Sequence, residues 1–260
     1  MPRTAIVPKS ILKLPSSCDW GGRESRVGRT SLFRRAFVHI LTPLLPLACA
    51  LCVACCATIS LAWDADTMLR AASARGPQAL AGARALQGVL ADVVAQDDPA
   101  KLAAINDFFN RRIVFTSDQE VWGQADYWAS PLEMFEKGRG DCEDYVIGKY
   151  FALLAAGMPS AKLRLVYVRA LIGGEGVSGG VAQAHMVLAY YATPGAEPLV
   201  LDSLIGEIRP ASRRPDLVPV FSFNSDGLWQ GTGGPSAGDP VARLSRWREV
   251  LAKARSEGFQ

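Results

Sequence analysis

Two residues stand out as candidates for nucleophilic chemistry, Cys142 and His185. They are the one cysteine and the one histidine after residue 62, because the other cysteines and His39 lie at or before Cys56. A cysteine thiolate attacks carbonyl carbons, and an imidazole can take the thiol proton and return it to a leaving group. Either residue alone is more often an ordinary buried side chain. A third, suitably placed acid is therefore needed to predict catalysis.

Asp202 is the candidate for that acid. His185 lies in Ala-His-Met-Val-Leu-Ala-Tyr-Tyr, which predicts a buried strand, and Leu-Val-Leu-Asp202 ends a second short strand. A turn centred between Thr193 and Pro194 would place residues 185 and 202 opposite each other across a hairpin. Asp202 would then hold the imidazole in the tautomer that the thiol requires. Cysteine at a helix start, histidine on a strand and acid on the next strand is the order of papain-like thiol enzymes.

The residues around Cys142 predict a sharp turn followed by a helix. In Gly-Arg-Gly-Asp-Cys142-Glu-Asp-Tyr the glycines permit the turn, and Asp141 can cap a helix that begins at the thiol. The positive end of the helix would favour the thiolate. The backbone N–H of Cys142 is expected to be one oxyanion donor, and the second is expected from the Trp122–Trp128 loop.

Asp141, Glu143 and Asp144 surround the candidate nucleophile, and their negative charge should raise the thiol pKa. One interpretation is that these acids cap the helix and favour its positive end. The other is that they bind a hard cation, calcium above all, which takes several carboxylate oxygens and would neutralise them. The residue types alone leave both interpretations open.

The remaining pattern predicts helices first and an antiparallel sheet afterwards, which is an α+β fold. Residues 173–180 are rich in glycine but precede no helix, so they predict a hairpin loop rather than a phosphate loop. The expected helices cover residues 64–95 (one or two helices), 97–112, a short segment from 131, a segment from 142 to about 157, and 241–256. The expected strands cover residues 113–115, 163–171, the segments around His185 and before Asp202, and an edge strand at 219–223.

The chain divides by composition into residues 1–62, 63–229 and 230–260. Ala36 to Ala62 contains no charged residue, follows Arg34-Arg35 and ends in Ser-Leu-Ala, which is typical of a signal peptide with its cleavage site. An uncleaved membrane anchor is the alternative. No methionine lies between Met1 and Met68, so a true start at a non-methionine codon near Val27 or Leu32 is a further alternative. Residues 230–240 predict a Gly/Pro/Ser linker to the terminal helix.

Charge and cysteine usage narrow the classes of function. The formal charge is +3, but residues 1–62 hold eight basic and two acidic residues, which leaves 20 basic against 23 acidic and a net charge of −3. This balance gives no sign of a nucleic-acid surface. Without the leader no cysteine pair remains for a disulfide. A lone thiol in an oxidising compartment is a liability unless it has a function.

Several motifs together resemble one known family. The stretch Asp126-Tyr-Trp-Ala-Ser-Pro-Leu-Glu133, then Gly-Arg-Gly-Asp-Cys142-Glu-Asp-Tyr, Ala-His185-Met-Val and Leu-Asp202-Ser-Leu, is similar to the bacterial transglutaminase-like cysteine proteinases of the LapG type. The resemblance covers roughly residues 95–215. It implies a papain/transglutaminase-like α+β core in which Cys142, His185 and Asp202 are catalytic.

The resemblance also implies a cofactor, a location and partners. Calcium would be bound by the acids that flank the nucleophile, Asp141, Glu143 and Asp144. The enzyme would act in the periplasm and cleave the N-terminal region of a large surface adhesin, so that biofilm cells detach. An inner-membrane cyclic-di-GMP receptor would regulate it. The same three catalytic residues would also serve a transglutaminase or a peptidoglycan-directed amidase. A binding module on an inactive protease scaffold is the alternative from another class.

Overall fold

The computed structural model describes residues 63–173 and 180–260. The predicted leader, and the middle of the predicted loop at 173–180, lie outside this part of the chain. None of the helices in the two described ranges is both long enough and apolar enough to span a bilayer.

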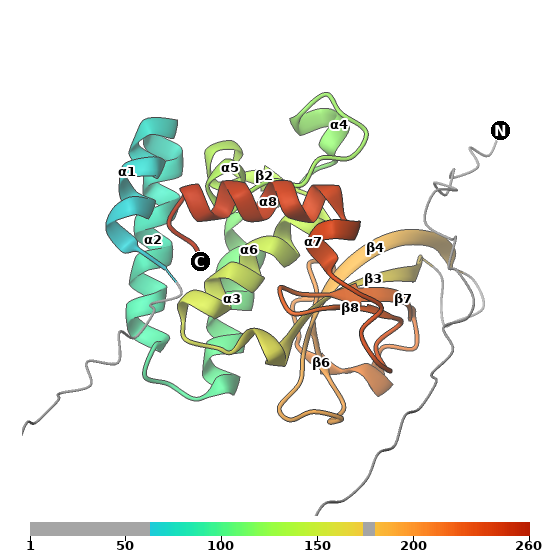
Figure 1. Cartoon of the computed structure of the whole chain (residues 1–260). Coiled ribbons are helices and arrows are strands. Elements are labelled where there is room, and N and C mark those ends of the chain that lie inside the picture. The colour runs from blue at the N-terminus through green and yellow to red at the C-terminus, as the bar shows by residue number, and fades with distance from the viewer. Residues whose placement is uncertain (1–62, 174–179) are drawn as a thin grey trace, which may run out of the picture. The chain divides into compact units, whose positions relative to one another are not determined.

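Helices precede the main sheet in the chain, and two more follow it. They are α1 (Ala65–Arg75), α2 (Pro77–Val93), α3 (Asp98–Arg112), α4 (Asp118–Val121), α5 (Pro131–Lys137), α6 (Cys142–Ala155), α7 (Pro240–Arg243) and α8 (Ser245–Ser256). Figure 1 shows α6 between α3 and α8, beside the strands. The helices predicted for residues 64–95 and 97–112 are confirmed as α1, α2 and α3.

The helix starts follow from residues that accept hydrogen bonds from free backbone N–H groups. Asp64 accepts from the N–H groups of Asp66 and Thr67 at the start of α1, and Asp97 accepts from Ala100 at the start of α3. Ser130 and Glu133 form a capping box at the start of α5. These caps satisfy donors that the helices themselves cannot, so the boundaries are set locally.

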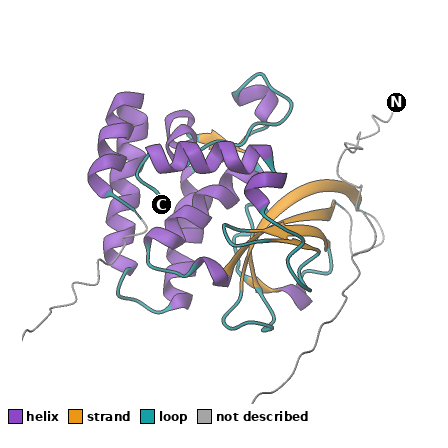
Figure 2. Ribbon diagram, in the orientation of Figure 1, coloured by secondary structure: helices purple, strands orange, loops and turns teal. Residues whose placement is uncertain are grey.

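The main sheet has six strands, all antiparallel, in the order β6-β5-β4-β3-β7-β8. The strands are β3 (Leu163–Ile172), β4 (Val181–Tyr190), β5 (Leu199–Leu201), β6 (Arg209–Pro210), β7 (Leu217–Phe223) and β8 (Leu228–Gln230). Two short strands, β1 (Val114–Phe115) and β2 (Arg139–Gly140), form a separate parallel pair. Figure 2 shows the six strands gathered at one side of the helices. The α+β prediction is confirmed.

The prediction that residues 219–223 form an edge strand is wrong. β7 lies inside the sheet, between β3 and β8. Pro219 cannot donate a ladder hydrogen bond, and a proline in a sheet is usually confined to an edge strand or a bulge. The register between β3 and β7 shifts between Tyr167 and Val168, so that Tyr167 pairs with Phe221 and Val168 with Pro219. This irregularity accommodates the proline within the sheet.

Helix α6 is almost fully enclosed, and every residue from Asp144 to Ala155 is buried. A helix that is apolar on all sides belongs in a protein core. Its side chains join the main core cluster, which also includes Met186 and Leu188 of β4. A smaller cluster on β3, β4 and β5 includes Val168 and Val187. Buried on all sides, α6 gives Cys142 a rigid support.

The terminal helix predicted at 241–256 is present as two pieces, α7 and α8, which meet at Leu244. Trp247 of α8 is fully buried in the main core and packs edge-on against Tyr150 of α6. Glu257 follows α8, and its carboxylate accepts hydrogen bonds from the Leu132 N–H and from Arg75. The C-terminal segment therefore supports α5, which precedes the candidate nucleophile, and α6, which begins with it.

Candidate active site

Cys142 is the first residue of α6, and Asp141 is its N-cap residue, as the sequence predicted. The Asp141 N–H donates to the Asp144 carboxylate at 3.4 Å, which ties the turn to the first turn of the helix. The Cys142 thiol donates to Oε2 of Glu143 at 2.9 Å. The sulfur is thus at the positive end of a rigid helix, with its proton directed to a neighbouring carboxylate.

His185 and Asp202 are in direct contact. Nε2 of His185 lies 2.8 Å from Oδ1 of Asp202, and the two residues are 3 % and 0 % exposed. Because Asp202 occupies Nε2, the nitrogen left to exchange a proton with a thiol is Nδ1.

The predicted register of the two residues is wrong by two positions. Leu188 pairs with Leu201 and Tyr190 with Leu199, so β5 ends just before Asp202, and residue 202 does not lie opposite residue 185. The turn is centred one position later than predicted, at Pro194-Gly195, where Gly195 has φ 82°. A shift of two keeps a side chain on the same face of a sheet, so the contact survives as a diagonal one.

Arg214 holds the second oxygen of Asp202. Its Nη2 donates to Oδ2 at 2.7 Å, and its guanidinium also binds Asp216. Burial raises the pKa of Asp202, but hydrogen bonds from His185, the Leu204 N–H and Arg214 outweigh it and bring the pKa to about 2. Asp202 is therefore an ionised, fully engaged acceptor.

Two further side chains fix the backbone of Asp202. Its carbonyl oxygen accepts hydrogen bonds from Nζ of Lys149 at 3.1 Å and from Nδ2 of Asn110 at 3.0 Å. Lys149 is fully buried on α6, and burial lowers its pKa to about 7. Arg214, Lys149 and Asn110 were missed by the sequence analysis. A lysine two turns after Cys142, with no other charged residue between Asp144 and Ala155, was the one available signal.

The Cys142 sulfur contacts β4 next to His185. Burial raises the pKa of the Cys142 thiol well above its ordinary value, and Glu143 and Asp141 raise it further. The N–H of Met186, the residue after His185, donates to the sulfur and acts in the opposite direction. The expected conflict between thiolate formation and the flanking acids is therefore present in the folded chain.

The three predicted metal ligands are part of a larger acidic cluster. Carboxylate oxygens of Asp118, Asp141 and Asp144 lie within 4.8 Å of one another, as do those of Asp118, Asp126 and Glu143. Burial and the neighbouring acids raise the pKa of Asp118 to about 6, that of Asp141 to about 10, and that of Asp144 well above its ordinary value. Burial and the closeness of like charges therefore disfavour full ionisation of the cluster, and Arg246 offsets it only in part, through a 3.0 Å ion pair with Asp126.

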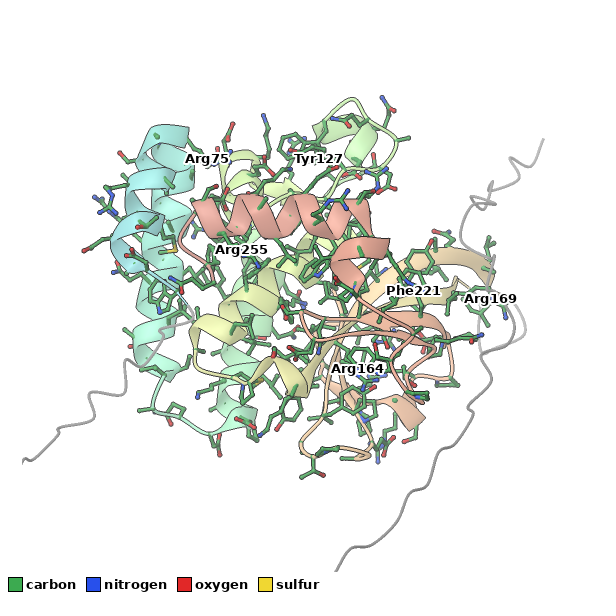
Figure 3. The ribbon with its side chains drawn as sticks, viewed as in Figure 1. Arg75, Tyr127, Arg164, Arg169, Phe221 and Arg255 are labelled. Carbon is green, nitrogen blue, oxygen red and sulfur yellow. The ribbon has the colours of Figure 1, made fainter. Side chains whose placement is uncertain are left out.

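Asp118 is the member that the sequence analysis missed. It is the first residue of α4, 24 positions before Cys142, and no spacing rule connects it to the thiol. Its Oδ2 accepts a hydrogen bond from the Tyr127 N–H at 2.5 Å, while the Ala129 N–H donates to Asp144. The C-terminal end of the Trp122–Trp128 loop is therefore attached to the acidic cluster. Figure 3 shows Tyr127 beside α8, where its hydroxyl oxygen accepts a hydrogen bond from Nζ of Lys253 at 2.7 Å.

The residues of this cluster fit a calcium ion. Oδ1 of Asp118 and Oδ1 of Asp141 are buried and receive no hydrogen bond from the described residues. Buried acceptors without partners are rare unless an ion or water satisfies them. Hard carboxylate oxygens are the ligands that calcium prefers, and the set contains no second thiolate or imidazole to select zinc.

A family model and several solved structures match this chain. The model of the family described as bacterial transglutaminase-like cysteine proteinase BTLCP matches residues 85–215. No curated protein sequence matches at a significant level.

Solved structures of LapG from Legionella pneumophila are similar over most of both chains. The EGTA-treated form is 36% identical over 74% of this chain and 97% of that one, with a TM-score of 0.64. The calcium-bound form is 36% identical over 73% of this chain and 98% of that one, with a TM-score of 0.63.

Proposed function

Because this chain belongs to the bacterial transglutaminase-like cysteine proteinases and is a cysteine protease, we propose that it is an exported, calcium-dependent endopeptidase. Its substrate is the N-terminal region of a large surface adhesin, whose cleavage releases cells from a biofilm. The observation that carries the catalytic part is the buried His185–Asp202 hydrogen bond of 2.8 Å beside the helix that begins at Cys142.

Cys142 is the nucleophile in this proposal. Its sulfur attacks the scissile carbonyl carbon as the thiol proton passes to Nδ1 of His185. The backbone N–H of Cys142, at the start of α6, stabilises the oxyanion. The imidazolium then protonates the leaving amine, and an acyl-thioester remains. Water attacks the thioester with His185 as general base, which restores the thiol and releases the acid.

Asp202 fixes the orientation and the tautomer of His185 in both steps. Its low pKa, about 2, keeps it an acceptor throughout, so it takes the Nε2–H hydrogen bond without taking the proton. Arg214 supports this role by holding the other oxygen at 2.7 Å. The proton therefore moves between sulfur, Nδ1 and the leaving group.

Calcium would be held by Asp141, Glu143 and Asp144, with Asp118 as a fourth carboxylate. Two unpartnered buried oxygens and the raised pKa values of Asp118 and Asp141 support such a site. When bound, the ion would supply positive charge that offsets the acids beside the thiol. LapG of Legionella pneumophila has been solved both calcium-bound and EGTA-treated, which supports calcium as the ion.

Location and partners follow from the family resemblance and the predicted leader. The uncharged segment from Ala36 to Ala62 supports export to the periplasm, where the adhesin N-terminus is accessible. An inner-membrane cyclic-di-GMP receptor would withhold the enzyme from its substrate. The cleaved segment would be an extended linker of small residues, since a scissile chain must lie extended across the thiol.

Incubation of the purified chain with the N-terminal domain of a co-encoded adhesin tests this function. Calcium-loaded enzyme should give two fragments on a gel, and Cys142→Ala should give none while keeping the wild-type melting temperature. Attachment of an amine donor to glutamine side chains of an intact adhesin would instead establish a transglutaminase. An intact, unmodified adhesin would contradict the proposed substrate.

A further inference from the structure

One edge of β4 is open where the strand approaches the candidate nucleophile. β4 pairs with β3 along its whole length, from Val181 to Tyr190. On its other side, β5 pairs only with the segment from Leu188 to Tyr190. From Val187 back to Val181, this edge has no strand partner among the described residues.

The hydrogen-bond alternation of the hairpin shows which backbone groups lie on that edge. The Tyr191 N–H donates to the Lys162 carbonyl at 2.8 Å, and this pair continues the β3–β4 register by one step. In an antiparallel ladder, pairs that exchange hydrogen bonds alternate with pairs whose groups point outward. His185 is thus bonded to β3, whereas the N–H and C=O groups of Met186, Ala184 and Ala182 point away from β3.

Two observations agree with this assignment. Leu188 and Tyr190 lie two and four positions after Met186, so their N–H and C=O groups also point away from β3. These are the residues of β4 whose outward groups can bond to β5. The Met186 N–H, which should also point outward, donates to the Cys142 sulfur. The open edge therefore begins at the thiol and continues through Ala184 and Ala182.

The edge beyond Met186 is accessible. Val181 to Ala184 are all exposed, and no hydrogen bond from the described chain reaches the backbone groups of Ala182 or Ala184. Arg169 of β3 pairs in register with Ala184. Figure 3 shows Arg169 toward the outer end of the β3–β4 hairpin. An exposed row of unpaired N–H and C=O groups is a template for another extended chain.

We propose that the protein substrate binds as an added strand on the open edge of β4, hydrogen-bonded to the backbone of Ala184 and Ala182, with its scissile carbonyl at Cys142. This inference rests on the proposed function and adds the mode of substrate recognition. Pairing through main-chain groups selects an extended, unfolded segment and requires no particular side chain. Such pairing suits the cleavage of a linker of small residues.

Two thiol reagents test this strand addition on the calcium-loaded chain. Acetyl-Ala-Ala-Ala chloromethyl ketone and chloroacetyl-Ala-Ala-Ala amide carry the same tripeptide on opposite sides of the reactive carbon, so they cover both possible directions. Each is compared with versions that are N-methylated at one alanine. For one reagent, methylation of the alanine whose N–H faces β4 should slow Cys142 labelling about tenfold, as expected for one lost hydrogen bond. Methylation of its neighbours should have much less effect.

Ala184→Pro is the matching change in the protein. Proline lacks the outward N–H, and the hydrogen bonds to β3 are made by the neighbouring residues, so the strand should tolerate it. The responsive reagent should label this variant about tenfold more slowly, while labelling by iodoacetamide stays within about twofold of wild type. Gln183→Ala is the control, because it changes a side chain on the same strand and leaves every edge N–H in place.

Equal labelling of wild type and Ala184→Pro by both tripeptide reagents would overturn the proposal. So would N-methylation that has the same effect at every position. The methylation pattern is a ratio of rates at one thiol, so it decides the question even if Ala184→Pro does not fold. Slow iodoacetamide labelling of all variants would instead count against the thiolate of the proposed function.

Discussion

Asp202 has a hydrogen-bonding side chain on each oxygen, His185 on Oδ1 and Arg214 on Oδ2. We expect Arg214→Met to destabilise the fold by about 3–5 kcal/mol, because it leaves a buried carboxylate without its partner. It also removes one of the interactions that lower the pKa of Asp202. The stabilisation from Asp202 is present above its unfolded pKa and lost as pH falls through the folded one. Acid unfolding of Arg214→Met should therefore begin at a higher pH, as measured by circular dichroism.

Asp216→Asn is the control for this change. It changes the other partner of Arg214, the Asp216 carboxylate, whose side chain is one-third exposed. The ion pair between Arg214 and Asp202 stays intact. We expect a loss of about 1 kcal/mol or less and little change in the acid transition. Equal acid transitions in Arg214→Met and Asp216→Asn would contradict the assigned role of Arg214.

The sequence could predict Cys142 and His185 because each type occurs once after residue 62, and Asp202 because it ends the apolar strand that follows His185. It could not predict Arg214, Lys149 or Asp118. These residues approach the site from separate elements, and an arginine or an aspartate is too common for its presence alone to be a signal. Which cations and carboxylates share a site is decided by tertiary packing.

At the scale of the element, α6 must pack closely for Cys142 to keep its place. A Cβ added at Gly148 would lie 2.5 Å from the Phe109 ring and 2.6 Å from Met134. We expect Gly148→Ala to lower the free energy of unfolding by about 1–3 kcal/mol through overpacking, despite the better helix propensity of alanine. Denaturant unfolding followed by tryptophan fluorescence measures this change.

Gly88→Ala in α2 is the matched substitution, since nothing lies within 4 Å of an added Cβ there. Alanine should stabilise this exposed helical position by about 0.5–1 kcal/mol. If both substitutions shift the unfolding midpoint in the same direction, close packing around α6 is not what constrains Gly148.

Most elements were predictable from the sequence, because apolar periodicity and caps are local signals. The exceptions concern pairing. β7 was predicted as an edge strand, but a shift in register admits Pro219 inside the sheet. The β4–β5 register was off by two because the sequence does not say which residues of Thr-Pro-Gly form the turn. Strand order and register depend on contacts between distant segments.

At the scale of the whole molecule, an ion that binds only the folded chain should control its stability. Chelation should lower the melting temperature and calcium should restore it. The free energy of unfolding should rise by about 2.7 kcal/mol when calcium is a hundredfold above its dissociation constant. Magnesium should restore it poorly because it requires a tighter octahedral shell. Calorimetry measures the shift, and Asp118→Asn should reduce it. Superimposed melting curves with and without chelator would leave helix capping as the role of the acids.

The pH dependence of the chelated chain follows from the raised pKa of Asp118. The folded state favours protonated Asp118, so this residue contributes its full stabilisation of the fold below its ordinary pKa of 3.8. That stabilisation is lost as pH rises to about 6. The melting temperature in chelator should therefore fall over this range. The difference in melting temperature between the calcium-loaded and the chelated chain should widen over the same range, since calcium binds the ionised acids. A constant difference from pH 4 to pH 7 would contradict this coupling.

The pH dependence of Cys142 alkylation by iodoacetamide tests the central claim most directly. With calcium bound, His185 and the start of α6 should stabilise the thiolate, so alkylation should proceed at a pH well below that of a free thiol, about 8.5. His185→Ala should slow it. In chelator, burial and the carboxylates of Glu143 and Asp141 raise the pKa of the thiol, so the profile should move to higher pH. Alkylation that begins only above about pH 8 in saturating calcium would contradict Cys142 as an activated nucleophile.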